Sequence, residues 1–348
     1  MAAMLQGKNR YITDRTILQM PDKKKDIPRK DLRDFCVMLG RVGVDFIEVD
    51  RKTFEALGAL TEGVRYIFRV EKEEDMRMCF EHGFKYCVMG SRSLMWAQMQ
   101  YKRKLEKIKT ILEVDVYNAQ KTEHLIRLKG FIDFQGIYGI RMKGLSQSML
   151  IDWHDIIGMI KEYLSVKVDL CPEDKYHMAT ATGVEGLMNG ADFVTATFGG
   201  SGGLYGFAAL EEVLLAAKVI GGLRVRGDMT LLPELRRLYE KMTGENVKGI
   251  KPVVGDDIFK YESGIHADGI RKNPATYEPY GPDEVGQRRQ LILGKHSGSN
   301  AVIMKLKELC IDCEGKNVTD ILKRMRAKSI RLKRNVPDSE FIALCNEL

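Results

Sequence analysis

The sequence has 348 residues, of which 44% are hydrophobic and 30% charged, with a formal net charge of +7. A chain of this length exceeds one average domain of about 100–200 residues, so a large domain with an appendage, or two domains, is expected. No apolar run approaches the roughly 18 residues of a membrane span, so no membrane association is expected. The basic runs lie far apart without aromatic residues between them. This pattern argues against nucleic-acid binding, whereas a polyanionic cofactor such as coenzyme A is compatible with the charge.

The cysteines and the first residues indicate the compartment. The start, MAAMLQGKNR, lacks the apolar core of a secretory signal. Seven cysteines, an odd number, fit reduced thiols better than a disulfide framework. Both observations predict a cytoplasmic protein. Cys310 and Cys313 form a single C-x-x-C pair without a second pair or suitably spaced histidines, so a structural or incidental role is favoured over a zinc site.

Short runs of strand-forming residues alternate with helical patterns along the first two thirds of the chain. Eight such runs are predicted as strands: 11–14, 44–49, 64–69, 86–89, 111–116, 131–134 continuing to 140, 166–170 and 193–198. Apolar residues at helical spacing lie between and after them, for example in 30–39, 73–80, 149–163 and 210–219. Eight strand-then-helix units predict a (β/α)8 TIM barrel. A doubly wound open sheet is the alternative fold, because sequence does not show closure.

Beyond the repeats the pattern changes, and a boundary is predicted near residue 250. Residues 1–250 then form the barrel, and 251–348 form an accessory subdomain with helices at 301–309 and 318–327. Between them lies YESGIHADGIRKNPATYEPYGPDEVG, residues 261–286, which is neither helix- nor strand-periodic. A segment of such specific composition requires a separate explanation.

In barrels the chemistry lies where strands end, so those positions are the first candidates. Strand 1 ends with one acid and one base and no acidic pair. Strand 7 is followed by residues that include soft, hard and borderline metal ligands: Cys171, Glu173, Asp174 and His177. Exposed loop residues are the alternative interpretation of that group. Strand 8 leads into a glycine-rich turn at 199–206, which suits either anion binding or a tight barrel turn.

The segment 251–298, KPVVGDDIFKYESGIHADGIRKNPATYEPYGPDEVGQRRQLILGKHSG, resembles the post-barrel segment of the homocitrate and isopropylmalate synthase family. GVDFIEVD at 43–50 and GADFVTATFGGSGGLYGFAALEEVLLA at 190–216 are similar to its second and eighth strands. The branch associated with nitrogen fixation is the most similar, and the chain resembles its divergent, omega-type polypeptide. The resemblance implies a metal-dependent barrel that condenses acetyl-CoA with a 2-oxo acid.

The same resemblance shows where this chain departs from the family. The family holds a divalent cation with an Arg-Asp pair after strand 1, an H-x-H-N-D motif after strand 7 and an asparagine in the loop after strand 8. In this sequence those positions fall on Leu18, Gln19, Cys171, Glu173 and Phe207, while the loop's Glu and Arg fall on Gly203 and Leu204. These residues form no recognisable octahedral site, so the barrel is expected to bind no metal of its own.

The post-barrel segment, by contrast, keeps the family pattern. His266 falls on a catalytic histidine and Tyr277 on its companion tyrosine. A histidine can move the enolisation or alkoxide proton, and a phenol can donate to the developing oxyanion. The neighbouring Glu262, Ser263 and Gly264 are predicted to shape the loop and to contact substrate.

In the family this segment reaches across a dimer. The leading hypothesis is therefore a companion subunit of a homocitrate-synthase-type enzyme that donates His266 and Tyr277 to the metal-bearing barrel of a homologous partner. The expected substrates are acetyl-CoA and, by resemblance, 2-oxoglutarate. Two alternatives remain: a self-sufficient synthase, as a homodimer, with a site rebuilt from Glu173, Asp174, His177 and Cys171, or a non-catalytic regulatory homologue.

Overall fold

The computed structural model describes residues 10–20, 27–116, 126, 128–130, 132–133, 136–144, 153–312 and 317–347. The chain divides into two compact units, residues 1–247 and 248–348. Each is considered by itself below.

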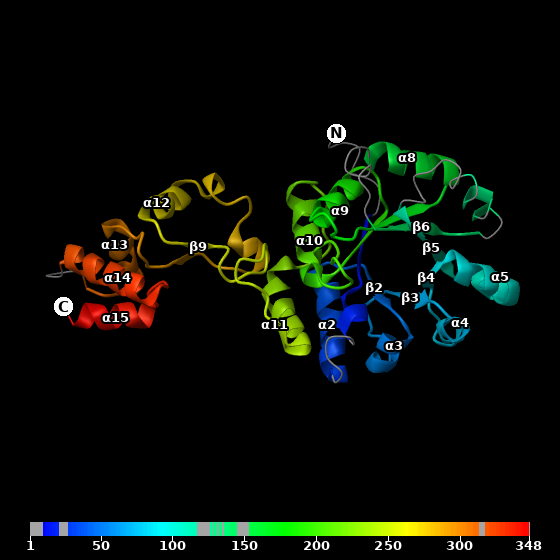
Figure 1. The fold of residues 1–348 in the computed structure, drawn as a ribbon, viewed down its shortest axis with the longest axis horizontal. Helices are drawn as coiled ribbons and strands as arrows, with labels where there is room; N and C mark the ends of the chain where they lie inside the picture. Colours follow the sequence, from blue (N-terminus) through cyan, green and yellow to red (C-terminus); the bar gives the residue numbers. More distant parts are fainter. Residues whose placement is uncertain are drawn as a thin grey trace. The chain divides into compact units, whose positions relative to one another are not determined.

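The first unit is a closed barrel of eight parallel strands in sequence order, with β1 paired to both β2 and β8 (Figure 1). Closure is seen in the register that joins Tyr11 to Phe193 and Asp14 to Ala196. This confirms the predicted (β/α)8 barrel. The strands are β1 Tyr11–Asp14, β2 Phe46–Val49, β3 Tyr66–Val70, β4 Tyr86–Gly90, β5 Lys109–Asp115, β6 Gly139–Lys143, β7 Lys167–Cys171 and β8 Phe193–Ala196.

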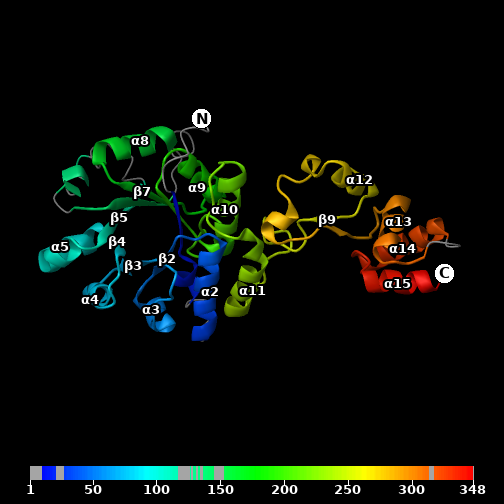
Figure 2. The same cartoon turned by 180° about the vertical axis from the view of Figure 1, so that it is seen from behind.

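Helices cover the outside of the strands, as the views from opposite sides show (Figures 1 and 2). They form because one side of each is apolar: α2, for example, buries Leu32, Phe35 and Leu39. Helix α3 begins at a capping box in which the Asp50 carboxylate accepts from the Thr53 N–H at 2.7 Å. The barrel helices are α2 Arg29–Val42, α3 Arg51–Leu57, α4 Glu73–Glu81, α5 Ser91–Leu105, α8 Trp153–Leu164, α9 Ala179–Met188, α10 Leu210–Val219 and α11 Leu232–Thr243.

One predicted strand is placed differently. Strand β6 begins only at Gly139, whereas Ile132 and Asp133 are helical. The Gly136 N–H donates to the Ile132 carbonyl at 2.9 Å, as in a helical turn, and Gly136 has a φ of +63°. This left-handed residue interrupts the extended run expected over 131–140. Residues 131, 134 and 135 of that run, and 149–152 of the helix expected over 149–163, lie outside the described residues.

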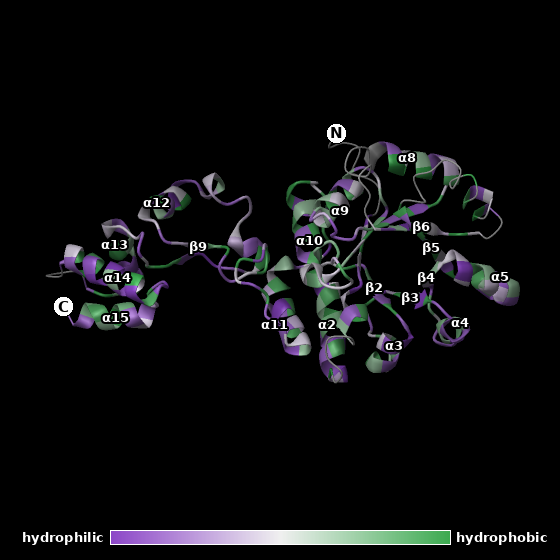
Figure 3. Ribbon diagram, viewed as in Figure 1, coloured by the Kyte–Doolittle hydropathy of each residue, from purple (hydrophilic) through white to green (hydrophobic). Residues whose placement is uncertain are grey.

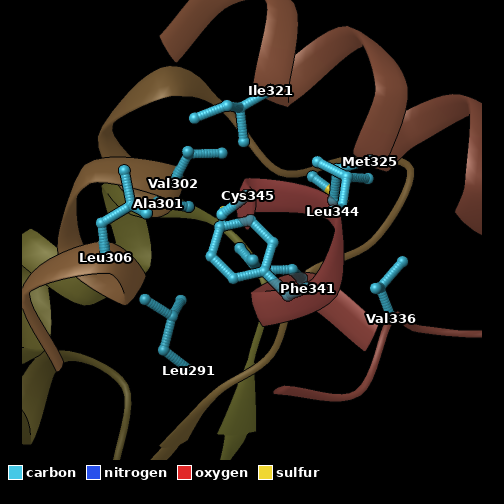
Figure 4. Close-up of a cluster of buried hydrophobic side chains, with 11 residues drawn as sticks. Leu291, Ala301, Val302, Leu306, Ile321, Met325, Val336, Phe341, Leu344 and Cys345 are labelled. Atoms are coloured by element: carbon cyan, nitrogen blue, oxygen red, sulfur yellow. The ribbon is translucent and has the colours of Figure 1, made fainter. Parts of the chain in front are cut away.

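The second unit contains a two-stranded parallel sheet and four α-helices among its described residues. They are β9 Lys260–Tyr261, β10 Gln290–Leu291, α12 Gly264–Lys272, α13 Ser299–Glu308, α14 Val318–Leu332 and α15 Asp338–Asn346. Helices α14 and α15 carry both apolar and polar residues (Figure 3), as expected of helices with one buried face. The buried Phe341 ring lies at the centre of their apolar cluster, among residues that include Val302, Ile321 and Leu291 (Figure 4).

Within the part of the chain that the structure describes, no helix combines the length and the apolar character that crossing a membrane requires. The described cysteines are free thiols, and of the C-x-x-C pair Cys310 is exposed while Cys313 lies outside the described residues.

Candidate functional site

The two residues that the resemblance marks as catalytic lie next to each other in the second unit. His266 is on the exposed side of α12, and its ring centroid is 4.9 Å from that of Tyr277 at an interplanar angle of 53°. Tyr277 follows the short turn Pro274–Thr276 and is 46% exposed, so the imidazole and the phenol both reach solvent. The structure therefore brings together a base and a hydroxyl donor on one accessible surface.

The helix that carries His266 was not predicted from the sequence. Helix α12 includes two glycines, which disfavour helix, and buries only Ala267 and Ile270, so its apolar periodicity is weak. A Ser263 cap compensates, because the Ser263 Oγ accepts from the Ile265 N–H at 3.2 Å. The local signal was thus a capping serine rather than a repeat of apolar residues.

Gly269 is a site residue that the sequence analysis missed. A Cβ built at Gly269 would lie 2.5 Å from the Tyr277 Cε2, which is closer than real Cβ contacts allow. Gly269 follows His266 by three residues and therefore shares its side of the helix. A glycine at this position therefore leaves room for the Tyr277 ring against this turn of α12, beside the histidine. The signal available in the sequence was the glycine of His-Ala-Asp-Gly.

The predicted loop residues connect the start of α12 to the turn at 295–298. The Glu262 Oε1 accepts from the His296 N–H at 2.5 Å, and the Glu262 carbonyl accepts from the Ser297 Oγ at 3.3 Å. A Cβ at Gly264 would be 3.0 Å from the Asn300 Cβ, so α12 passes close to the start of α13. These contacts hold the loop in shape. Binding of substrate by Glu262, Ser263 and Gly264 stays a prediction.

In the first unit, the positions that the resemblance assigns to metal ligands converge at one end of the barrel. The Gly203 N–H donates to the Gln19 Oε1 at 3.2 Å, and Glu173 pairs with Phe207 in an antiparallel bridge. The loops after strands 1, 7 and 8 therefore meet. We call this end of the barrel the mouth and define it by Arg15, Gln19, Cys171, Glu173, Gly203 and Phe207.

An arginine lies among these positions. The Arg15 Nη1 donates to the Cys171 Sγ at 3.3 Å, and its guanidinium carbon is 4.6 Å from the centroid of the Phe207 ring. Burial raises the pKa of the Cys171 thiol, which opposes the thiolate form that binds metal. The Gln19 oxygen is already bonded, and Phe207 offers no ligand atom. The residues present at the mouth do not fit a divalent cation.

The alternative ligands after strand 7 each have other contacts. The Asp174 Oδ1 accepts from the Ala179 N–H, at the first residue of α9, at 3.0 Å, and the exposed His177 Nδ1 is 3.5 Å from Asp174. Glu173 lies 3.7 Å from the Lys143 Nζ. Among the described residues, no group of three His, Cys, Asp or Glu side chains is arranged to hold a metal ion. The geometry therefore lends no support to the rebuilt site.

Beneath the mouth, charged side chains fill the barrel interior. The fully buried Arg141 donates to Glu48 at 2.5 Å and to Asp169 at 2.6 Å, and Arg69 bridges Glu48 and Glu113 at 2.7 and 2.6 Å. Burial alone would raise the pKa of Glu48, but Arg141 and Arg69 together hold that pKa well below its usual range. This paired layer is a structural element that the sequence analysis did not anticipate.

Asp14, at the end of β1, predicts a pH dependence of stability. Burial raises its pKa to about 7, against the hydrogen bonds from Thr16 that lower it. An unfolded aspartate has a pKa of about 3.9. Between these values the folded chain keeps a proton that the unfolded chain has lost, so the contribution of Asp14 to stability falls as pH rises through this window.

We expect the difference in unfolding free energy between the wild type and Asp14→Asn to change by about 1 kcal/mol per pH unit between pH 5 and 7, in favour of the variant at higher pH. The single asparagine oxygen can still accept from the Thr16 N–H, and the loss of the bond from the Thr16 hydroxyl to the second Asp14 oxygen is the same at every pH, so it does not affect the slope. Urea unfolding at several pH values measures this difference. Parallel curves for the two proteins would show that Asp14 does not titrate in this range.

Comparison with known proteins supports the same family in both units. Residues 253–332 match the family described as "Homocitrate synthase post-HMGL domain-like". The chain is 36% identical over 350 residues to "Homocitrate synthase, omega subunit" of Clostridium pasteurianum, covering 100% of this chain and 98% of that protein. It is 38% identical over 191 residues to "Homocitrate synthase 1" of Nostoc sp., covering 55% of this chain and 51% of that one.

Solved structures match the barrel. The hydroxymethylglutaryl-CoA lyase of Pseudomonas aeruginosa superposes with a TM-score of 0.55 at 16% identity, over 69% of this chain and 94% of that one. The Bacillus subtilis HMG-CoA lyase gives a TM-score of 0.54 at 17% identity, over 69% and 95%. These likenesses show the barrel fold, and the full-length relative shows the family. The chain belongs to the homocitrate synthase family.

Proposed function

We propose that this chain is the companion subunit of a homocitrate-synthase-type enzyme that condenses acetyl-CoA with a 2-oxo acid, by similarity 2-oxoglutarate. In this proposal a homologous polypeptide with intact ligands contributes the metal-bearing barrel, and the present chain contributes His266 and Tyr277 from its second unit. The full-length relative carries the name of a subunit, which supports an assembly of unlike chains.

The observation that carries the proposal is the arginine at the mouth. The Arg15 guanidinium is hydrogen-bonded to Cys171 and stacked on Phe207. Cys171 and Phe207 stand at two of the positions where the family places ligands of a cation. A fixed positive charge there opposes binding of a divalent ion by electrostatic repulsion. The second unit keeps the histidine and tyrosine of the family, whereas the mouth of the first unit has lost the metal ligands. A division of labour between two polypeptides accounts for both observations.

The chemistry required of the second unit is proton transfer. The condensation removes a methyl proton from acetyl-CoA and then forms an alkoxide at the former ketone carbon. The imidazole of His266 can accept or deliver one of these protons near neutral pH. The Tyr277 hydroxyl beside it can donate a hydrogen bond to the developing oxyanion. Their exposure suits residues that act on a substrate held by another subunit.

The test is reconstitution. The chain is purified alone and mixed with a homologous synthase polypeptide from the same organism that carries the Asp, His-x-His and Asn ligands. Loss of the acetyl-CoA thioester absorbance in the presence of 2-oxoglutarate and Mg²⁺ measures the condensation. We expect turnover by the mixture, its loss with a chelator, and none by this chain alone. Equal turnover without the partner would contradict the companion role.

A further inference from the structure

The turn that carries Tyr277 has little packing of its own. Residues 273–277 are all exposed, and the Tyr277 and Glu278 N–H groups donate to the same Pro274 carbonyl, at 3.0 and 2.9 Å. These two bonds shape the turn internally but do not connect it to the rest of the unit. An exposed segment with few buried contacts opens easily unless another interaction holds it in place. The position of the Tyr277 ring beside His266 therefore needs a further support.

An ion pair between Glu278 and Arg289 supplies this support. The Arg289 Nε lies 2.8 Å from the Glu278 Oε1 and the Nη2 lies 2.6 Å from the Oε2, so one edge of the guanidinium meets both carboxylate oxygens. The Glu278 side chain is only 8% exposed, so it turns inward where the residues before it face solvent. Bidentate pairs of this kind fix geometry as well as adding energy. The pair thus fixes the direction in which the chain leaves Tyr277.

Arg289 in turn belongs to a rigid part of the second unit. It directly precedes β10, whose Gln290 N–H donates to the Phe259 carbonyl at 3.1 Å. The next residue, Leu291, is 3% exposed and lies in the apolar cluster around Phe341 (Figure 4). Because the strand and the cluster hold the backbone next to Arg289, the ion pair ties the exposed turn to the core of the unit.

We propose that Arg289, through its ion pair with Glu278, holds the Tyr277 ring beside His266 and is thereby a positioning residue for the proposed condensation. The inference rests on the proposed function, because it concerns the same pair of rings. Arg289 is assigned no contact with substrate and acts only through Tyr277. Without the ion pair the turn is free to move away from α12, and a misplacement of about 1 Å can lower a rate by about 10²-fold.

The first measurement follows the two rings in this chain alone, by nuclear magnetic resonance. The chain has six histidines, so the His266 Hε1 signal is identified by its absence in His266→Ala. With the ring centroids 4.9 Å apart, the ring current of Tyr277 displaces this signal, and Tyr277→Leu measures by how much. Spectra are recorded well above the pH range in which histidines ordinarily titrate. We expect Arg289→Gln to move the His266 signal most of the way to its position in Tyr277→Leu.

Further variants make this result specific to the ion pair. Glu278→Leu breaks the pair from the other side without leaving a buried carboxylate, and it should displace the signal as Arg289→Gln does. Because the two residues act as one pair, the double variant should show no additional displacement. The matched control is Arg324→Gln, because Arg324 pairs with Asp320 at 3.1 Å within α14 and ties down no turn. This control should leave the His266 signal in place.

The second measurement is the rate of the reconstituted mixture, with this chain at a saturating concentration so that weaker assembly does not lower the rate. We expect Arg289→Gln to lower kcat at least tenfold with a small effect on KM, since both rings remain and only their arrangement changes. Arg324→Gln should keep the wild-type rate.

Thermal unfolding establishes that each variant is folded, and if Arg289→Gln is not, Glu278→Leu decides by the same measurements. The proposal is overturned if Tyr277→Leu does not displace the His266 signal, if the folded pair variant leaves it at the wild-type position, if Arg324→Gln displaces it equally, or if it moves while kcat stays normal. Failure of the proposed function looks different, because the wild-type chain then gives no turnover with its partner. The displacement in the chain alone would still decide whether Arg289 positions Tyr277.

Discussion

Replacing Arg141 with methionine is expected to lower the free energy of unfolding of the barrel by about 3–5 kcal/mol. The substitution leaves Glu48 and Asp169, both within 2% of complete burial, without their shared partner. Arg69 still contacts Glu48, but Asp169 keeps only the Thr195 hydroxyl at 2.9 Å. Two buried carboxyl groups must then either remain charged at high cost or take up protons.

Both tryptophans, Trp96 and Trp153, belong to the barrel unit, so their emission during urea unfolding reports on the barrel within the intact chain. The matched control is Arg65→Met, because the Arg65 side chain is 46% exposed and its partner Asp45 keeps a hydrogen bond from the Ile12 N–H when Arg65 is removed. That control is expected to cost about 1 kcal/mol or less. Equal losses for the two variants would show that the buried layer does not stabilise the barrel.

The sequence predicted the barrel well because its strands are short apolar runs in a regular alternation. The bounds of β1 and α10 agree with the predicted 11–14 and 210–219. The run predicted over 131–140 was wrong at 132–133, which are helical, although its end at 139–140 belongs to β6; a local apolar pattern does not reveal that Gly136 adopts a left-handed conformation. Helix α12 was missed because its apolar side is too small to produce a periodic signal.

The candidate site was predictable only in part. The resemblance placed His266 and Tyr277 in one segment, but their ring contact depends on Gly269, whose importance appears only when Tyr277 lies against it. The buried charges of the barrel did leave a trace in the sequence. Charged residues stand inside largely apolar strands, as Glu48 does in FIEV and Arg141 in GIRMK, where only the terminal Lys143 is also charged. Several such interruptions in one parallel barrel indicate that the charges meet inside it, because both sides of those strands are buried.

In the reconstituted enzyme, replacing His266 with alanine is expected to lower kcat by about 10²–10⁴-fold, the usual range for loss of a positioned acid–base group. The effect on KM should be small, because the imidazole acts on a proton that moves in the transition state rather than on substrate in the ground state. His266 is exposed, so the stability of the chain should not change measurably. Initial rates of thioester loss over a range of 2-oxo acid concentrations measure both parameters.

Two further variants separate chemistry from geometry at this pair. His82→Ala, a change at an exposed histidine at the end of α4 in the other unit, is the matched control and should leave kcat unchanged. Gly269→Ala alters neither ring, but its methyl group would lie where the Tyr277 ring packs, so kcat should fall with it as well. A normal rate for His266→Ala in a mixture that depends on this chain would show that the chain contributes something other than a proton-transfer group. A normal rate for Gly269→Ala alone would show instead that His266 acts without the Tyr277 contact.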